Sequence, residues 1–312
     1  MKYGNYTIDE DSNSSVSKIV KAIAIKSNVI EFGSSYGYIL KYLKDHKQCT
    51  VQGYEIDKEA VDLANEHGIP TEWMDLDVIQ KDFFENLDTN IDYIICADVL
   101  EHLKNITYVV KLISTYLEKN KNCTLLISFP NITYYGVVDQ LLHGKFQYKD
   151  LGILDHTHLR FFDKYELEKL FNNNNLEMKS IECINIDPKD SEFKVKLDNQ
   201  VVDILEAYNN ENYLTYQYVI ELQYSEIPTK KLTQDIPKIS AIKDWNNKLN
   251  SQIIELSDII SRKDNQIIEL NTLAHKQQDD IETLTKELDS MKRLKRKYTL
   301  IKNKIKSFLG IK

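Results

Sequence analysis

The sequence has few cysteines, glycines and prolines, and it has no long apolar run. Its 312 residues include only four cysteines, nine glycines and five prolines. The cysteines lie far apart and form no C-x-x-C pair, which argues against a zinc site or a disulfide framework and favours buried, reduced thiols. No run approaches the roughly 18 apolar residues of a membrane span, and the N-terminus shows no signal-peptide pattern. We therefore expect a cytoplasmic protein.

Charge is unevenly distributed along the chain. The formal net charge is −8, yet residues 292–312 contain nine Lys or Arg residues and no Asp or Glu. The body of the chain is therefore acidic and its end is strongly basic, so the two parts call for separate explanations.

Short apolar runs alternate with amphipathic segments over the first two thirds of the sequence. This alternation predicts an α/β, Rossmann-like fold, with a seven-stranded, mostly parallel sheet and helices on both faces. The last two strands have little helix between them, which predicts an antiparallel pair closing the sheet. The expected strands cover 28–32, 50–55, 71–74, 92–96, 124–129, 178–184 and 216–224.

The composition changes after Tyr224, and we divide the chain into three parts: a domain over 1–225, a linker over 226–244 and a C-terminal segment over 245–312. In the last part, apolar residues recur at alternating steps of four and three from Leu249 to Leu309. This 3.5-residue period is typical of a coiled coil, so we expect self-association or a helical partner. The alternative is one long helix that folds back on its own domain. Polar residues on the same seam are Lys263, Gln277, Lys295 and Lys302.

Two of the scarce glycines stand close together in V-I-E-F-G-S-S-Y-G, directly after a predicted strand. Gly33 and Gly37 predict a tight turn that lets the backbone approach a ligand at the start of a helix. The spacing differs from the G-x-G-x-x-G of dinucleotide-binding folds, which disfavours an NAD-dependent oxidoreductase. Glu31 adds a carboxylate at the strand end, which suits a cationic ligand better than a diphosphate.

The next two predicted strands also end in acids. Glu55 follows the glycine turn by about twenty residues, where a carboxylate can accept hydrogen bonds from both ribose hydroxyls. Asp75 ends the third strand and can accept from an adenine amino group. Because ligands of parallel sheets bind beyond the carboxyl ends of the strands, these acids and the glycine turn predict one nucleoside site.

From Ile19 to Tyr224, the sequence resembles the class I S-adenosylmethionine-dependent methyltransferases. The resemblance rests on E-F-G-S-S-Y-G, Y-E-I-D, M-D-L and D-Y-I-I-C-A-D-V-L-E-H-L, in that order. Ser35 departs from the family, where many members have glycine. The resemblance implies S-adenosyl-L-methionine as cofactor and a seven-stranded sheet whose last strand is antiparallel. The cofactor-binding residues that it implies are Glu31, Gly33, Ser34, Ser35, Gly37, Glu55, Ile56, Asp75, Leu76 and Asp98.

A cluster of ionisable residues follows the fourth predicted strand. If a helix begins there, Asp98, Glu101 and His102 project from one face, at positions i, i+3 and i+4. His102 could shape the cofactor pocket, act as general base for a hydroxyl acceptor, or bind a divalent metal with the two acids. The motif is similar to the E-x-x-E-H of ubiquinone-biosynthesis O-methyltransferases and small-RNA 2′-O-methyltransferases, which hold a metal with a later histidine. Asp98 is one methylene shorter than their first acid.

A second polar cluster lies in L-D-H-T-H-L-R-F-F, before a predicted helix. This segment is similar to a loop of bacterial methyltransferases of glycan and cell-envelope biosynthesis. By that resemblance, His158 and Arg160 face the acceptor, with His156 and Asp155 next in line as catalytic candidates. Helix capping and ion pairing are the alternative. Tyr134 and Tyr135 would line the same pocket or belong to the core.

These features predict a methyltransferase, O-directed, that acts on a sugar, a glycan or a lipid-linked acceptor of bacterial envelope biosynthesis. The alternatives are a small-molecule or RNA 2′-O-methyltransferase and a non-catalytic scaffold that carries the coiled coil. Residues 1–225 are acidic on balance, which disfavours nucleic acid. The basic residues of 292–312 flank apolar ones, a pattern that suits the inner face of the plasma membrane, a partner enzyme or a solvated helix end.

Overall fold

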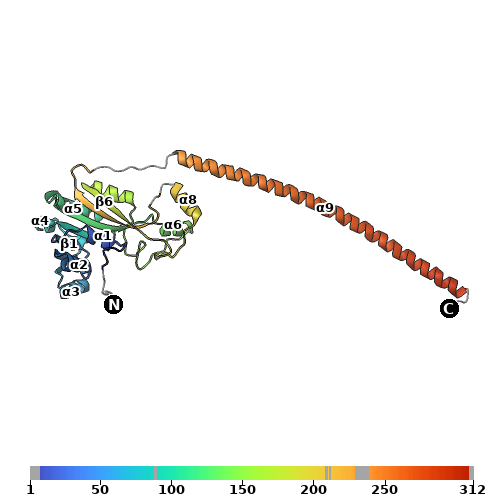
Figure 1. Ribbon diagram of the computed structural model, residues 1–312, viewed down its shortest axis with the longest axis horizontal. Helices are drawn as coiled ribbons and strands as arrows, with labels where there is room; N and C mark the ends of the chain where they lie inside the picture. The colour runs from blue at the N-terminus through green and yellow to red at the C-terminus, as the bar shows by residue number, and fades with distance from the viewer. Residues whose placement is uncertain (1–7, 88–89, 208–209, 211, 229–238, 309–312) are drawn as a thin grey trace. The chain divides into compact units, whose positions relative to one another are not determined.

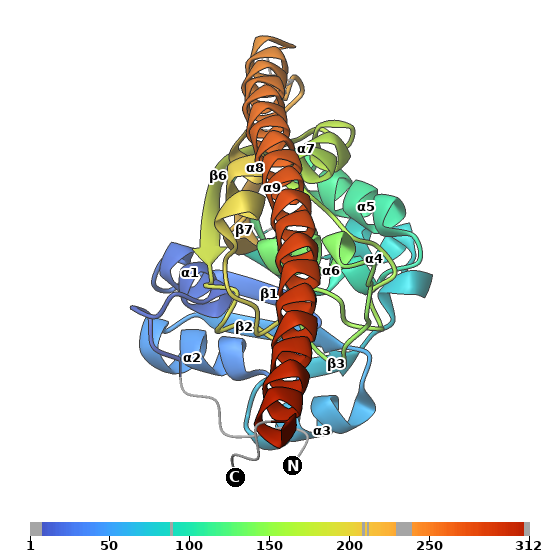
Figure 2. The same ribbon diagram turned by 90° about the vertical axis from the view of Figure 1, so that its right-hand side faces the viewer.

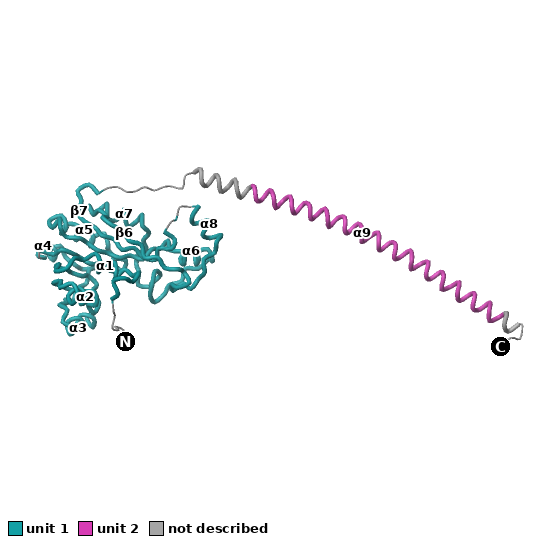
Figure 3. The backbone as a smooth tube through the Cα atoms, viewed as in Figure 1, with its two compact units in different colours: residues 1–238 teal, residues 239–312 magenta. Residues whose placement is uncertain are grey.

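The computed structural model describes residues 8–87, 90–207, 210, 212–228 and 239–308, and the side chains of the last segment from 251 to 304. The chain forms two compact units, residues 1–238 and 239–312 (Figure 3). The first unit is a sheet covered by helices, and the second is one helix.

A seven-stranded sheet forms the centre of the first unit, as the sequence predicted (Figure 1). The strand order is β3-β2-β1-β4-β5-β7-β6, with β1 to β5 parallel and β7 antiparallel to both of its neighbours. The polar ends of β1 to β4 therefore meet at one edge. The strands are β1 (Asn28–Phe32), β2 (Thr50–Glu55), β3 (Thr71–Trp73), β4 (Tyr93–Ala97), β5 (Thr124–Pro130), β6 (Leu176–Asn185) and β7 (Thr215–Tyr224).

Helices cover both faces of the sheet because side chains of a strand alternate between its faces. On β4, Ile94 and Cys96 pack with the helices on one face, and Ile95 packs with those on the other. Figure 2 shows α1 and α2 on one side of the strands and α4 and α5 on the other. The helices are α1 (Ser15–Ala22), α2 (Tyr38–Lys47), α3 (Lys58–Glu66), α4 (Lys81–Asn86), α5 (Ile106–Lys119), α6 (Tyr135–Leu142), α7 (Lys164–Asn172) and α8 (Asn199–Ala207), and the short 3-10 helices are η1 (Leu76–Val78) and η2 (Leu100–His102).

A small separate core supports the segment between α6 and α7. Tyr134, Ile153 and Leu154 have no exposed surface and pack together with Phe193. Tyr134 and Tyr135 are both fully buried, so they belong to the core and do not line an open pocket.

The cysteines correct one expectation. Cys49, Cys96 and Cys123 are buried and free, whereas Cys183 is exposed. It lies on β6, an edge strand of the sheet, most of whose side chains are half-buried or exposed.

The second unit is the helix α9 (Ile239–Phe308), which begins inside the segment that the sequence suggested as a linker. Every described side chain from 251 to 304 is exposed. Among the described helices, none combines the length and the apolar character needed to cross a membrane. The last four residues of the basic segment 292–312 lie outside the described residues.

Candidate functional site

The turn after β1 is built from left-handed backbone. Gly33, Ser35 and Gly37 have φ angles of 71°, 50° and 78°. A Cβ on Gly33 would collide with the side chain of Val99. Ser35 takes the same conformation without being glycine, which costs on the order of 1–2 kcal/mol. Its backbone N–H donates to Glu55 Oε2 at 2.8 Å, and this bond holds the turn in place.

The two glutamates behind the turn differ in their surroundings. Glu55 accepts from two backbone N–H groups, because Oε1 also accepts from Asp57 N at 2.8 Å. Glu31 is 2% exposed, and its Oε2 has no hydrogen-bond partner. Burial, followed by the charge of Glu55, raises the pKa of Glu31 to about 8. A cationic group bound nearby would stabilise the ionised form of Glu31.

A cavity of about 260 Å³ lies beyond the ends of the parallel strands. It lies where the sequence predicted the nucleoside site, and its lining includes six of the ten predicted cofactor residues. Glu31, Ser34, Ser35 and Gly37 do not line it: Glu31 lies on β1, and the other three belong to the turn after β1. The predicted residues in the lining are Gly33, Glu55, Ile56, Asp75, Leu76 and Asp98, and the others are Tyr54, Met74, Asp77, Val99, His102 and Leu103.

Asp75 and Asp77 belong to the cavity wall through local hydrogen bonds. Asp75 caps η1, since its Oδ1 accepts from Asp77 N at 2.9 Å. Asp77 Oδ1 accepts from Lys104 N at 2.9 Å and ties this wall to the segment after η2. Asp77 was not predicted, although its position two residues after Asp75 is visible in M-D-L-D.

Hydrogen bonds to β5 and β7 hold the side chain of Asp98, and it does not join the cluster of ligand-type residues that follows it. Its backbone is left-handed, with φ of 54°, and its Oδ1 accepts from Ser128 Oγ at 3.0 Å and from Gln217 Nε2. The predicted i, i+3, i+4 helical face does not form, because only the three residues of η2 are helical here. Asp98 therefore lies at the cavity and not with Glu101.

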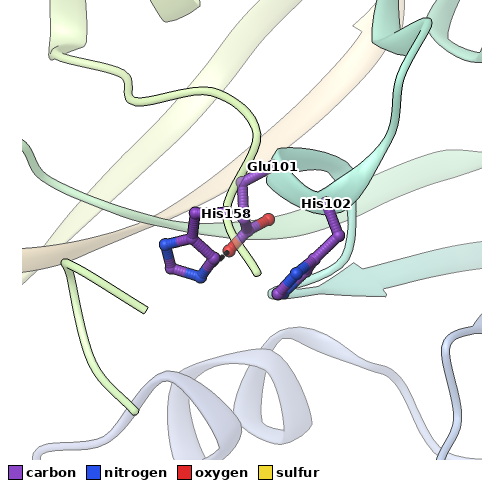
Figure 4. Close-up of side chains that lie close together, drawn as sticks. All are labelled: Glu101, His102 and His158. Atoms are coloured by element: carbon purple, nitrogen blue, oxygen red, sulfur yellow. Dashed lines mark ion pairs between the residues drawn. The ribbon is translucent and has the colours of Figure 1, made fainter. Parts of the chain in front are cut away.

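Three ligand-type side chains come together next to the cavity: Glu101, His102 and His158. One ligand atom of each lies within 4.8 Å of the others. Figure 4 shows Glu101 and His158 directed toward one another, with His102 beside them. His158 Nε2 lies 4.0 Å from Glu101 Oε1, and the two imidazole rings are 4.7 Å apart. The cluster shares Glu101 and His102 with the metal set predicted from sequence, and His158 takes the place of Asp98.

Glu101 is the unusual member of this cluster. It has no exposed surface, and neither carboxylate oxygen has a hydrogen-bond partner. Burial, followed by the charge of Asp98, raises the pKa of Glu101 well above its usual range. Burying a carboxylate without hydrogen-bond partners costs free energy, and a bound ligand would offset this cost.

The hydrogen bonds of His158 prepare its Nε2 atom to act as a ligand. Nδ1 lies 3.0 Å from the carbonyl oxygen of Ile153, and an Nδ1–H donor there leaves a lone pair on Nε2, facing Glu101. Burial lowers the pKa of His158, which favours the neutral ring. His102 Nδ1 lies 3.1 Å from Thr157 Oγ1, so the same loop orients both rings.

The other candidates of the loop do not reach this cluster. His156 has an exposed side chain, and its Nδ1 lies 3.2 Å from Lys149 O. Arg160 donates from Nη2 to Lys104 O at 3.2 Å. Asp155 accepts from Thr157 N and Oγ1, and so shapes the loop.

The backbone of the loop is attached directly to η2. The N–H groups of Leu159 and Arg160 donate to the carbonyl oxygen of Glu101, at 3.0 Å and 3.3 Å. These bonds bring His158 and Glu101 together although they are far apart in the sequence.

Comparison with known proteins identifies the family. A family model described as "Methyltransferase domain" matches residues 9–181, more than half of the chain. The chain belongs to the class I S-adenosylmethionine-dependent methyltransferases. The methyltransferase takes S-adenosylmethionine as its cofactor, and the cavity beside Gly33 and Glu55 is the candidate site for it.

Individual relatives of the methyltransferase are distant. A curated relative, (S)-tetrahydroprotoberberine N-methyltransferase of Eschscholzia californica, is 27% identical over 120 residues, which is 37% of this chain and 34% of the relative. The chain thus spans about a third of that protein's length.

Solved structures show similar folds at low identity. A SAM-dependent methyltransferase from Archaeoglobus fulgidus is 15% identical, with a TM-score of 0.45 over 68% of this chain and 92% of that one. A TehB-like SAM-dependent methyltransferase from Corynebacterium glutamicum is 14% identical, with a TM-score of 0.42 over 68% of this chain and 87% of that one.

Proposed function

We propose that this methyltransferase transfers its methyl group to a hydroxyl of a sugar or glycan in bacterial envelope biosynthesis, and that a divalent metal at Glu101, His102 and His158 assists the transfer. Methylation of a hydroxyl requires that its proton leave during the attack. A general base or a metal that acidifies the hydroxyl can meet this requirement. The cluster beside the cofactor cavity offers both kinds of group.

The observation that carries the proposal is the buried Glu101 carboxylate without hydrogen-bond partners. A structural carboxylate would be expected to accept backbone or side-chain bonds, as Glu55 does. One carboxylate and two imidazoles form a donor set suited to Zn²⁺, Mn²⁺, Fe²⁺ or Co²⁺. A metal held there would lower the pKa of an acceptor hydroxyl.

The residues around the cluster have distinct roles in this proposal. His158 holds its Nε2 lone pair toward Glu101 through the bond from Nδ1 to Ile153. His102 belongs to both places, since it lines the cofactor cavity and contacts His158. It thus stands between donor and acceptor, where it could also take the hydroxyl proton. Asp155 is a positioning residue that fixes Thr157.

A series of aromatic rings favours a ring-shaped acceptor with apolar surface. His158 is followed by Phe161 at 6.2 Å, then by Phe146 at 5.8 Å and Tyr148 at 5.6 Å, measured between ring centroids. Phe146 and Tyr148 are 41% and 57% exposed. Exposed aromatic rings beside a reaction centre can stack on the C–H face of a sugar ring, and this supports a saccharide acceptor.

Metal binding by the full-length protein tests the proposal without a known acceptor. Co²⁺ is titrated into the wild type, His158→Ala and His156→Ala, and its visible absorption is recorded. His156 is the matched control because it lies in the same loop but outside the cluster. We expect the wild type and His156→Ala to bind Co²⁺ with similar affinity. The affinity of His158→Ala for Co²⁺ should be at least tenfold lower. Equal binding by all three would refute the metal site.

Methyl transfer to acceptors tests the substrate class. Radiolabelled S-adenosylmethionine is incubated with nucleotide sugars, envelope polysaccharide, amines and RNA, with and without a chelator. Transfer to a saccharide that the chelator abolishes supports the proposal. Transfer to an amine that is insensitive to the chelator would contradict both the hydroxyl acceptor and the metal.

We further propose that the basic segment 292–312 attaches the protein to the inner face of the plasma membrane. Its described part alternates cationic residues with apolar ones such as Leu294, Tyr298 and Ile301, which are 65%, 66% and 58% exposed. Basic and apolar residues on one helix favour an anionic lipid surface, and such attachment would suit a lipid-linked acceptor.

A further inference from the structure

The helix α9 carries an apolar stripe that no described contact covers. Leu256, Ile260 and Leu284 on this stripe are 58%, 60% and 63% exposed. The stripe follows a heptad pattern whose a and d positions alternate at steps of three and four. Among the described side chains, the a positions are Ile253, Ile260, Ile267, Ala274, Ile281, Leu288, Lys295 and Lys302, and the d positions are Leu256, Lys263, Leu270, Gln277, Leu284, Met291 and Tyr298.

We propose that α9 pairs with α9 of a second copy of this chain as a parallel, in-register, two-stranded coiled coil. The branching of the seam residues argues for two strands. Four of the a positions are isoleucine. In the first five heptads, every apolar d position is leucine. β-branched residues at a with leucine at d favour parallel dimers over trimers and tetramers. The proposal does not depend on the proposed acceptor or metal.

The polar seam residues argue for the parallel, in-register arrangement. In that arrangement each seam residue faces its own copy, so Gln277 meets Gln277 and the two amides can hydrogen-bond to each other. Ala274 likewise meets Ala274, which keeps the small side chains in one layer. Lys263 meets Lys263 of the second copy. Asp264, at the neighbouring e position, lies next to the d layer of the second copy and can form an ion pair with Lys263 there.

The antiparallel arrangement over the same stretch is less favourable. With 253 opposite 291, Lys263 would face Ile281, and Gln277 would face Ile267. Each mismatch would occur twice and would leave a polar group without a partner among apolar ones. A parallel pair shifted by one heptad has the same defect, because Gln277 would then face Leu270 or Leu284.

The flanking charges agree with the parallel direction. In a parallel pair, a g position faces the e position five residues later on the other helix. Glu287 at g would face Lys292 at e, and it would do so on both sides of the seam. These attractive pairs lie next to Met291, where the apolar seam gives way to Lys295.

The proposed arrangement gathers both basic segments at one end of the pair. Each chain contributes nine Lys or Arg residues between 292 and 312. Mutual repulsion weakens this end, and an anionic surface or raised salt relieves the repulsion. The seam from Ile253 to Met291 therefore holds the pair together, and the basic end is left to bind anions.

The mass of the full-length protein in solution tests the pairing. Sedimentation equilibrium should give twice the chain mass of 36.5 kDa. Ile267→Asp places a charge on the seam and should give the single chain mass, with a dissociation constant raised at least a hundredfold. Ile268→Asp is the matched control: it changes the same residue type one position away, off the seam, and should stay dimeric. The two isoleucines are similarly exposed, at 54% and 61%.

Cysteine cross-linking tests the direction and register. Ala274→Cys is introduced into the full chain with Cys183→Ser, because Cys183 is the exposed native cysteine. The three native cysteines that remain, Cys49, Cys96 and Cys123, are buried. Under mild oxidation, the introduced cysteine should form a disulfide-linked dimer, since position 274 faces itself only in the parallel, in-register pair. In the antiparallel pair, position 274 faces 270, so Leu270→Cys mixed with Ala274→Cys would cross-link instead.

A dimer mass with the Ala274→Cys cross-link supports the proposal. A single chain mass for the wild type would overturn it and would favour α9 folding onto its own domain. A trimer mass would also overturn it. It would indicate that Ile259 and Leu273, at g positions, pack in the interface together with the a and d residues. Cross-linking only between positions 270 and 274 would overturn the parallel direction.

Discussion

Replacing Glu101 by methionine should make the protein more stable while removing its proposed metal site. Glu101 is fully buried, and neither carboxylate oxygen has a partner. Leaving a buried polar group without a hydrogen bond costs about 1–3 kcal/mol. Methionine is apolar and close in volume to glutamate, so Glu101→Met should raise the free energy of unfolding by about that amount.

The expected change is large enough to measure by thermal unfolding. For a domain of this size, 1 kcal/mol corresponds to about 2–4 °C in Tm, so Glu101→Met should melt about 2–12 °C above the metal-free wild type. Co²⁺ at a hundred times its dissociation constant should stabilise the wild type by about 2.7 kcal/mol, or about 5–11 °C. The same concentration of Co²⁺ should leave the Tm of Glu101→Met unchanged.

Glu101→Gln is the control for polarity. It keeps a buried polar group, so it should melt near the metal-free wild type, and it should lose the metal-induced shift as well. The reasoning would be refuted if Glu101→Met melted below the metal-free wild type, or if Co²⁺ raised the Tm of the wild type and Glu101→Met equally. The first result would mean that Glu101 has a structural partner, and the second would mean that Co²⁺ binds without Glu101.

Three further predictions concern the cofactor turn and the basic segment. Because the pKa of Glu31 in the folded protein, about 8, lies above its ordinary value of 4.5, wild-type stability should fall relative to Glu31→Gln as pH rises between these values and level off above them; parallel pH curves of Tm would contradict this. Gly33→Ala should weaken S-adenosylhomocysteine binding at least tenfold by calorimetry, because φ is 71° and the new Cβ meets Val99, whereas Gly144→Ala, also left-handed but without neighbours, should bind normally. Full-length protein should float with anionic but not neutral vesicles, and changing Lys292, Arg293, Lys295, Arg296 and Lys297 to glutamine should abolish flotation; failure of the wild type to bind would refute membrane attachment.

Much of the fold follows from local sequence patterns. Alternating apolar runs predicted all seven strands, and β2 from Thr50 to Glu55 has the predicted bounds. The short helices α1, α4 and α6 were not predicted, because segments of six or eight residues are too short to show a helical period. The helical segment of α9 was predicted from its apolar seam. It begins at Ile239, earlier than the predicted residue 245, because no strong sequence signal marks its start.

The site was predictable only in part. The motif order gave the cavity residues Gly33, Glu55 and Asp75, because strand ends of a parallel sheet meet at one edge. The cluster of Glu101 with His158 could not be derived from spacing, because it depends on a loop that returns from beyond β5. The place of Asp98 outside the cluster could not be predicted either, since its φ of 54° breaks the expected helix.

The backbone bonds from Leu159 and Arg160 to Glu101 have a consequence for how this enzyme can change its acceptor. They hold the loop by its peptide groups, so the side chains at Leu159 and at Tyr148 are free to vary while His158 stays in place. New acceptors could therefore be acquired by substitutions along the loop without rebuilding the reaction centre. Directed evolution confined to the exposed positions Phe146, Tyr148, Leu151 and Leu159 should then alter acceptor preference and leave cofactor affinity intact.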